Sequence, residues 1–182
     1  MRAVVTGAAG FVGSTLVDRL LDARHQVIGI DDFSSGTVAN LAGAINHNES
    51  HPGRFRLFDI DIQAPELAGI IAGANPDVIF HLAAQADPRA AVRDPHRDAR
   101  TNVLGTINLS EAGRLAGIRR IVYATCAPAG SCVGRSHAES PHAAAKLAGE
   151  MYLRAYAQLY GSAPICLALG NVYGPRQIPG SA

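Results

Sequence analysis

The sequence opens with the stretch Arg2-Ala3-Val4-Val5-Thr6-Gly7-Ala8-Ala9-Gly10-Phe11-Val12-Gly13. Residues 2–6 form a short apolar run typical of a buried strand, and the amphipathic pattern from Phe11 through Ala23 predicts a helix. Between them, glycines in the spacing G-x-x-G-x-x-G let the backbone approach a pyrophosphate, and a helix N-terminus favours that anion. The stretch therefore predicts a dinucleotide-binding turn. The alternative is a tight strand-to-helix turn without a ligand.

Two acidic residues follow the next predicted strand. Asp31 and Asp32 come directly after Gln26 to Ile30, and Asp31 lies 24 positions after Gly7. At about this distance an acidic residue binds the adenosine ribose hydroxyls of a dinucleotide. A carboxylate there would repel a 2′-phosphate, and no lysine or arginine occurs in residues 33–36. The pattern favours NAD over NADP, and a solvated strand end is the alternative.

The composition indicates one α/β domain. Hydrophobic residues make up 48% of the 182-residue chain and charged residues 17%. The net charge is +1 and no basic run exceeds Arg119-Arg120, so we expect no nucleic-acid partner. No segment approaches about 18 apolar residues, so we expect no membrane span. The cysteines Cys126, Cys132 and Cys166 show no C-x-x-C pairing, so we expect no disulfide framework, no metal site and a cytoplasmic location.

Strand and helix patterns alternate through the rest of the chain. This alternation predicts a doubly wound parallel sheet with helices on both faces, and a ligand crevice beyond the carboxyl ends of the strands. We expect irregular loops at Thr37 to Gly53 and Ala127 to Glu139. The further predicted strands are Arg54 to Phe58, Asp77 to Leu82, Ile118 to Ala124 and Pro164 to Leu169, and the helices are Gln63 to Ala74, His96 to Ala116 and Pro141 to Tyr160.

Six motifs in order resemble one enzyme family. They are Thr6 to Gly13, Asp59-Ile60, His81-Leu82-Ala83-Ala84-Gln85, Asn102-Val103-Leu104-Gly105-Thr106, Ser140 to Lys146, and Asn171-Val172-Tyr173-Gly174-Pro175-Arg176. Together they resemble the extended short-chain dehydrogenase/reductase family. Within it, the chain is most similar to NAD-dependent nucleotide-sugar epimerases and dehydratases of the UDP-glucose 4-epimerase type.

The resemblance implies a coenzyme and a substrate. NAD is the expected coenzyme and a UDP-sugar the expected substrate, whose nucleotide part Asn171 would face. Lys146 would bind the nicotinamide ribose and lower the pKa of the acid-base group beside it. The remaining coenzyme-binding residues are expected to be Gly7, Gly10, Phe11, Val12 and Gly13 at the pyrophosphate, Asp31 and Asp32 at the ribose, Asp59 and Ile60 at the adenine, and Leu82, Ala83 and Ala84 along the coenzyme path.

The expected catalytic residues depart from the family pattern. In these epimerases a tyrosine four residues before the lysine takes the proton of the sugar 4-hydroxyl as hydride passes to NAD, whereas this chain has His142. Imidazole is a general base near neutral pH, although a close Lys146 ammonium would lower its pKa. The alternative is a harmless residue in an inactive site. Where the family has a pair of serines after the fifth strand, this chain has Thr125-Cys126. Cysteine is a weak hydrogen-bond donor to the reacting oxygen.

The family members continue beyond the last motif into a substrate domain. We therefore expect residues 1–182 to form an NAD-binding Rossmann-like domain without that C-terminal domain, either as a fragment or as a truncated protein. Two functions remain open. One is an NAD-dependent UDP-sugar epimerase with altered catalytic residues, and the other is a non-catalytic NAD-binding module or degenerate epimerase. The resemblance also implies a homodimer formed through the helices that follow the fourth and fifth strands.

Overall fold

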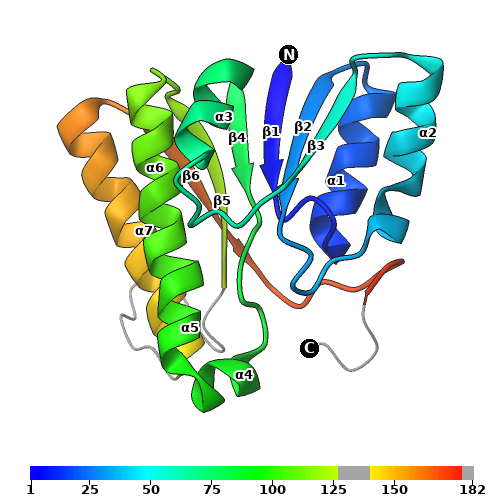
Figure 1. Ribbon diagram of the computed structural model, residues 1–182. Helices are drawn as coiled ribbons and strands as arrows, with labels where there is room; N and C mark the ends of the chain where they lie inside the picture. Colours follow the sequence, from blue (N-terminus) through cyan, green and yellow to red (C-terminus); the bar gives the residue numbers. More distant parts are fainter. Residues whose placement is uncertain (127–139, 178–182) are drawn as a thin grey trace.

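A computed structural model describes residues 1–126 and 140–177, except for the side chain of Cys126. The described residues form one six-stranded sheet in the order β3-β2-β1-β4-β5-β6, in which every pairing is parallel (Figure 1). The doubly wound parallel sheet expected from the sequence is confirmed. The strands are β1 Arg2–Thr6, β2 Gln26–Asp31, β3 Phe55–Asp59, β4 Val78–His81, β5 Arg120–Cys126 and β6 Ala163–Leu169.

Helices cover both faces of the sheet. In Figure 1, α1 and α2 lie on one side, whereas α3, α6 and α7 lie on the other. Within the described ranges, none of the helices is both long enough and apolar enough to cross a membrane. The helices are α1 Phe11–Asp22, η1 Val38–Leu41, α2 Ala42–Ser50, α3 Leu67–Ala74, α4 Pro88–Arg93, α5 Pro95–Ala99, η2 Arg100–Leu104, α6 Gly105–Leu115 and α7 Pro141–Tyr160.

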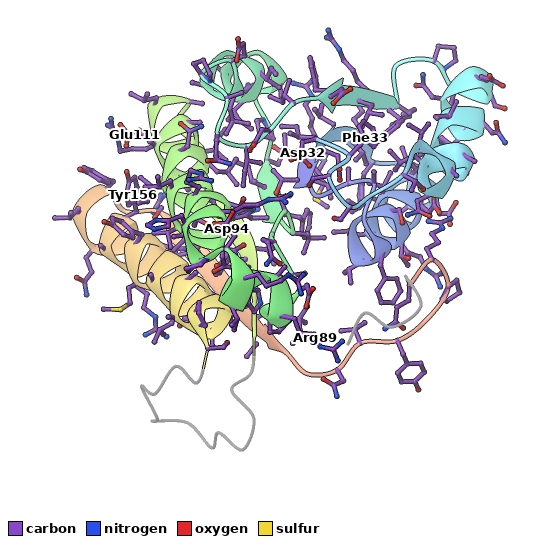
Figure 2. All side chains as sticks on the ribbon, turned by 60° about the horizontal axis from the view of Figure 1, so that its bottom comes forward. Asp32, Phe33, Arg89, Asp94, Glu111 and Tyr156 are labelled. Carbon is purple, nitrogen blue, oxygen red and sulfur yellow. The ribbon has the colours of Figure 1, made fainter. Side chains whose placement is uncertain are left out.

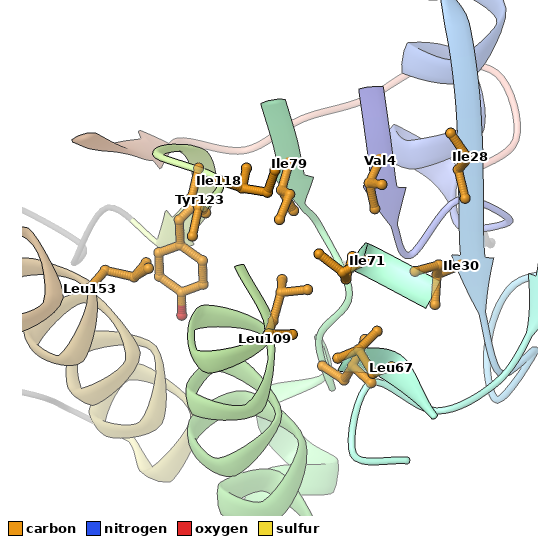
Figure 3. Close-up of a cluster of buried hydrophobic side chains, with 13 residues drawn as sticks. Val4, Ile28, Ile30, Leu67, Ile71, Ile79, Leu109, Ile118, Tyr123 and Leu153 are labelled. Atoms are coloured by element: carbon orange, nitrogen blue, oxygen red, sulfur yellow. The ribbon is translucent and has the colours of Figure 1, made fainter. Parts of the chain in front are cut away.

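The two faces of the sheet bury two hydrophobic clusters. On the α3, α6 and α7 side, strand residues such as Val4 and Ile79 pack with Ile71, Leu109 and Leu153 of the three helices (Figure 3). On the α1 and α2 side, the cluster comprises Ala3, Val5, Ala8, Ala9, Val17, Leu20, Leu21, Val27, Leu41, Ala44, Phe55 and Val78. Burial of both faces explains why the central strands β1 and β4 are nearly continuous apolar runs.

The expectation of an irregular loop from Thr37 to Gly53 is wrong. This segment contains the short helix η1 and the helix α2. Leu41 and Ala44 are fully buried against the α1 side of the sheet. The other apolar side chains of the segment, such as Val38 and Ile45, are exposed, so the tertiary packing of Leu41 and Ala44 stabilises these short helices.

The helix expected from His96 to Ala116 is also interrupted. It begins as α5 at Pro95, passes through one π-helical turn at η2 and continues as α6 from Gly105. A separate helix, α4, precedes it and is capped by the side chain of Asp87, which accepts a hydrogen bond from Arg89 N. The predicted helix at Gln63 to Ala74 begins later, at Leu67.

The edge strand β6 is open on one face. Pro164 and Cys166 are half-buried, whereas Ile165 and Leu167 are 57% and 45% exposed. In the sheet register Ile165 lies beside Val122 and Leu167 beside Ala124. No described helix covers these apolar side chains, so β6 presents an exposed hydrophobic strip, hereafter the β6 strip, formed by Ile165 and Leu167.

Candidate functional site

The strand order reverses between β1 and β4, and the carboxyl end of this strand pair, with the turns that follow it, is hereafter called the crevice. The connections from these neighbouring strands run toward opposite edges, and this reversal of strand order is where doubly wound sheets bind ligands. The two strand ends are in contact, because a Cβ added to Gly7 would lie 2.7 Å from Ala83 N. Thr6 accepts hydrogen bonds from Leu82 N on its carbonyl and from Ala83 N on Oγ1.

The glycine turn has a backbone that side chains would disrupt. Gly7 has a φ of +70°, and a Cβ on Gly13 would lie 1.9 Å from the Gly7 carbonyl oxygen. Gly10 is the N-cap of α1, where no side chain caps the helix and the first turn contains no acidic residue. Phe11 and Val12 are half-buried in this turn. Since the first N–H groups of a helix have no intrahelical partners, this end of α1 suits an anion.

Asp31 ends β2 beside the glycine turn. Its carboxylate is buried and accepts hydrogen bonds from Ala9 N at 2.8 Å and Phe33 N at 2.9 Å. Burial raises the pKa of Asp31, the two backbone donors oppose that rise, and the charges of Asp32 and Asp59 add to it. Figure 2, which brings the carboxyl ends of the strands forward, shows Asp32 and Phe33 at this end of the sheet. The acidic strand end is thus fixed in place by the turn it faces.

A segment that the sequence analysis assigned to an irregular loop braces the glycine turn. Thr37 N and Asn40 Nδ2 both donate to the Ala9 carbonyl oxygen, at 3.2 Å and 2.8 Å. A Cβ on Gly36 would lie 2.6 Å from the Ala9 carbonyl carbon. Gly36 and Asn40 therefore belong to the site, and the sequence analysis missed them.

The other expected coenzyme residues lie around the same crevice. Asp59 ends β3 opposite Asp31 in the sheet register, and Ile60 N donates to the Asp31 carbonyl oxygen. Asp59 is exposed, and Ile60 is half-buried against the core. Leu82, Ala83 and Ala84 follow β4 and are half-buried. The crevice thus gathers residues from the ends of the four strands β1 to β4.

The expected catalytic residues lie at the end of β5 and on α7. The side chain of Ser140 accepts a hydrogen bond from Ala143 N and so begins α7, which buries His142 and Lys146. The Lys146 Nζ atom lies 4.2 Å from the centroid of the Tyr123 ring on β5. Thr125 is buried near the end of the same strand. The expected four-residue spacing on one helical face is confirmed for His142 and Lys146.

A buried polar network surrounds His142. Its Nδ1 atom lies 3.4 Å from Asp98 Oδ1 and 3.4 Å from Asn102 Nδ2. Burial lowers the pKa of His142, the Lys146 charge lowers it further, and Asp98 and the Gln85 backbone raise it. The expected direction is correct, although burial is the larger cause. The sequence analysis missed Asp98, whose spacing of four from Asn102 on a predicted helix was the available signal.

A second buried histidine, His81, links the ends of β1 and β4 to α6. His81 ends β4, with Nδ1 2.8 Å from Thr6 Oγ1 and Nε2 2.9 Å from Thr106 Oγ1. Thr106 donates its hydroxyl proton to the Asn102 carbonyl oxygen, so it accepts from His81 Nε2. Burial, with a smaller contribution from Lys146, lowers the pKa of His81 to about 3. His81 is therefore neutral and carries its proton on Nε2.

Asn171 follows β6, is exposed and takes no part in these networks, whereas the side chain of Cys126 lies outside the described residues. The segment that contains Asn171 crosses toward α1, where Arg176 Nη2 lies 2.6 Å from Asp18 Oδ2. Gly174 packs beside the Phe11 ring at the start of α1. The described part of this segment therefore packs against α1, which begins at the glycine turn.

The proteins to which this chain is similar include epimerases, both by sequence and by structure. A family model described as the NAD dependent epimerase/dehydratase family matches residues 3–182. UDP-glucose 4-epimerase of Mycolicibacterium smegmatis is 46% identical over 190 residues, covering 98% of this chain and 58% of the relative. The crystal structure of Thermotoga maritima UDP-glucose 4-epimerase with UDP-glucose has a TM-score of 0.88 at 36% identity, covering 100% of this chain and 60% of that one.

A further solved structure shares the fold. Thermus thermophilus UDP-glucose 4-epimerase in complex with NAD has a TM-score of 0.86 at 35% identity, covering 100% of this chain and 58% of that one. The chain thus spans about three-fifths of the length of these relatives. The match of the family model over nearly the whole sequence and the shared fold agree with the crevice described above. The chain belongs to the NAD-dependent epimerase/dehydratase family.

Proposed function

We propose that this chain is the coenzyme-binding part of an NAD-dependent nucleotide-sugar epimerase that acts on a UDP-hexose. The observation that carries the proposal is that the glycine turn, the Asp31 carboxylate and the segment after β4 meet at the carboxyl ends of the strands, and that this segment bonds to Asn102 beside the buried His142. Relatives named UDP-glucose 4-epimerase, one in complex with NAD and one with UDP-glucose, support the choice of coenzyme and substrate.

The residues of the crevice fit a dinucleotide. The uncapped start of α1 at Gly10, Phe11, Val12 and Gly13 would hold the pyrophosphate, because its N–H groups meet no capping side chain. Asp31, with Asp32 nearby, would accept hydrogen bonds from the adenosine ribose hydroxyls. The remaining contacts would come from Gly7 beneath the pyrophosphate, from Asp59 and Ile60 at the adenine, and from Leu82, Ala83 and Ala84 along the path to the nicotinamide.

The residues on β5 and α7 would bind and transfer the proton of the sugar 4-hydroxyl. NAD, when bound, would supply a reversible hydride acceptor for the sugar C4. His142 would accept the proton of the 4-hydroxyl as the hydride leaves and return it in the reverse step. Lys146 would bind the nicotinamide ribose and disfavour the protonated form of His142. Thr125, with Cys126, would hydrogen-bond the reacting oxygen.

Substrate and subunit contacts extend this proposal. Asn171 would face the nucleotide part of the UDP-sugar, which its exposed position after β6 permits. A homodimer would form through α6 and α7, whose outer surfaces expose Leu115, Met151 and Leu159. A cytoplasmic location and the division into a coenzyme domain and a separate substrate domain are further parts of the proposal.

A second candidate function is an NAD-binding module without turnover. His142 is only 6% exposed, and its Nδ1 atom is turned toward Asp98 and Asn102, which favours a residue held within the fold. Both candidates require NAD binding. They differ in whether a UDP-hexose reduces the bound coenzyme.

Single-turnover absorbance separates the two functions. The chain is saturated with NAD and mixed with excess UDP-galactose or UDP-glucose, and formation of reduced nicotinamide is followed by its absorbance. The epimerase proposal expects reduction that His142→Ala abolishes and that the exposed His96→Ala control retains. The absence of reduction with intact NAD binding would favour the non-catalytic module, and the absence of NAD binding would exclude both.

A further inference from the structure

The proposed chemistry gives no role to the buried carboxyl group of Asp98. Asp98 lies on α5, is 1% exposed and contacts side chains from two other elements. Its Oδ1 atom accepts a hydrogen bond from Asn102 Nδ2 at 2.8 Å and lies 3.4 Å from His142 Nδ1. A buried carboxyl group is costly unless it is paired, so these contacts require a consistent assignment of protons.

The orientation of the Asn102 amide can be assigned from its partners. Gln85 N, which can only donate, lies 3.1 Å from Asn102 Oδ1, and the Gln85 carbonyl oxygen, which can only accept, lies 3.0 Å from Asn102 Nδ2. A flipped amide would place acceptor against acceptor and donor against donor. The side-chain nitrogen of Asn102 therefore faces Asp98 and His142.

The donors and acceptors around Nδ1 indicate the tautomer of His142. The two hydrogens of Asn102 Nδ2 go to Gln85 O at 3.0 Å and Asp98 Oδ1 at 2.8 Å. Neither remains for His142 Nδ1 at 3.4 Å, so Nδ1 cannot be an acceptor of that amide. It instead has a carboxylate oxygen within hydrogen-bonding reach. His142 Nδ1 therefore carries the proton and donates it to Asp98 Oδ1.

We propose that Asp98 is a positioning residue that holds His142 as the Nδ1–H tautomer, so that Nε2 is the atom that accepts the substrate's hydroxyl proton. The inference rests on the proposed epimerase function. A carboxylate that fixes an imidazole through Nδ1 and stabilises its protonated form is a known way to prepare a histidine base. As the substrate O–H bond breaks, the proton moves to Nε2, and the imidazolium keeps its Nδ1–H bond to Asp98.

The charges around His142 oppose each other. Lys146, one turn further along α7, disfavours the imidazolium, and Asp98 on α5 favours it, as does the backbone of Gln85. Of the two described charged groups that act on His142, Asp98 is thus the one that stabilises the protonated ring. Its loss should lower the pKa of His142 and remove the preference for the Nδ1–H tautomer.

Nitrogen NMR of the histidine side chains tests the inference without requiring turnover. The full chain is labelled with ¹⁵N-histidine, His142 is assigned by comparison with His142→Gln, and both ring nitrogens are followed against pH. The native protein should show a protonated Nδ1 and an unprotonated Nε2 at neutral pH. Asp98→Asn should lower the pKa of His142, and Asp98→Glu should restore it in part. Asp94→Asn on the same helix is the matched control, since asparagine also caps helices and Asp94 is exposed.

The outcomes separate this inference from the proposed function. An Nε2–H tautomer in the native protein, or an unchanged His142 pKa in a folded Asp98→Asn variant, would overturn the inference even if NAD is reduced by a UDP-hexose. The tautomer measurement on the native protein decides the question if Asp98→Asn does not fold. The expected tautomer together with no NAD reduction would uphold the pairing of Asp98 and His142 and refute the epimerase proposal.

Discussion

Lowering the pH should destabilise the fold through His81. This side chain is 1% exposed at the end of β4 and is neutral, with hydrogen bonds to Thr6 and Thr106. Burial, with Lys146 nearby, lowers its pKa from 6.5 to about 3. In the unfolded chain the same imidazole is hydrated and titrates near its ordinary value. Between these two pKa values only the unfolded chain binds the proton, so acid favours unfolding.

The size of the effect follows from that difference. Above pH 6.5 His81 is neutral in both states, and its contribution to the pH dependence vanishes. Below pH 6.5 the free energy of unfolding should fall by about 1.4 kcal/mol per pH unit until the pH nears the folded-state pKa. Lowering the pH from 7.5 to 5.5 should therefore cost about 1.4 kcal/mol through this residue alone.

Urea unfolding at these two pH values measures the effect. His81→Asn should be less stable at both pH values but should lose about 1.4 kcal/mol of the native pH dependence. The exposed His96→Asn variant is the control and should retain the native dependence. If His81→Asn cannot be folded, the ring nitrogens of His81 in the native protein can be followed by NMR. Protonation of His81 in the folded protein between pH 5.5 and 7.5 would refute the reasoning.

Three further predictions concern the crevice, its charges and the open sheet edge. Gly10→Val should weaken NAD binding, measured by calorimetry, roughly tenfold or more, since one lost hydrogen bond to a charged group costs about 1.5–3 kcal/mol. The control is Gly69→Val on α3, where an added Cβ meets nothing within 4 Å. Lys146→Met should raise the pKa of His142, because the ammonium lowers it, and an unchanged NMR titration would contradict this. Replacing Ile165 and Leu167 by lysine should reduce association beyond the proposed dimer, measured by light scattering, because the β6 strip is apolar and exposed. Replacing Met151 and Leu159 on α7 should instead weaken the proposed dimer, and unchanged higher association in the β6 variant would contradict the first expectation.

The sequence predicted the sheet because its signals are local. The apolar run before Gly7 and the helical pattern after Gly13 lie within one strand-turn-helix unit, and similar units recur along the chain. The segment from Thr37 to Gly53 was misassigned because α2 is stabilised by tertiary contacts of Leu41 and Ala44. Such contacts depend on the position of a distant sheet face, which periodicity does not report.

The site was predicted unevenly for a similar reason. Asp31 and the glycines follow strand ends in the sequence, so their meeting at one edge could be inferred. The pairing of Asp98 with His142 joins residues 44 positions apart on different helices, and no spacing rule connects them. The sequence identifies His81 only as part of a family motif. Its neutral state follows from its burial between Thr6 and Thr106 in the structure.

Calorimetric titration of the chain with NAD and with NADP tests the central claim most directly. The claim is that the glycine turn and the Asp31 carboxylate form an NAD site. NAD should bind at one site, at least tenfold more tightly than NADP, because a hydrogen bond between Asp31 and the ribose diol contributes about 1.5–3 kcal/mol and a 2′-phosphate would be repelled. Asp31→Ala should remove most of this preference. No binding of NAD, or equal or tighter binding of NADP, would contradict the account.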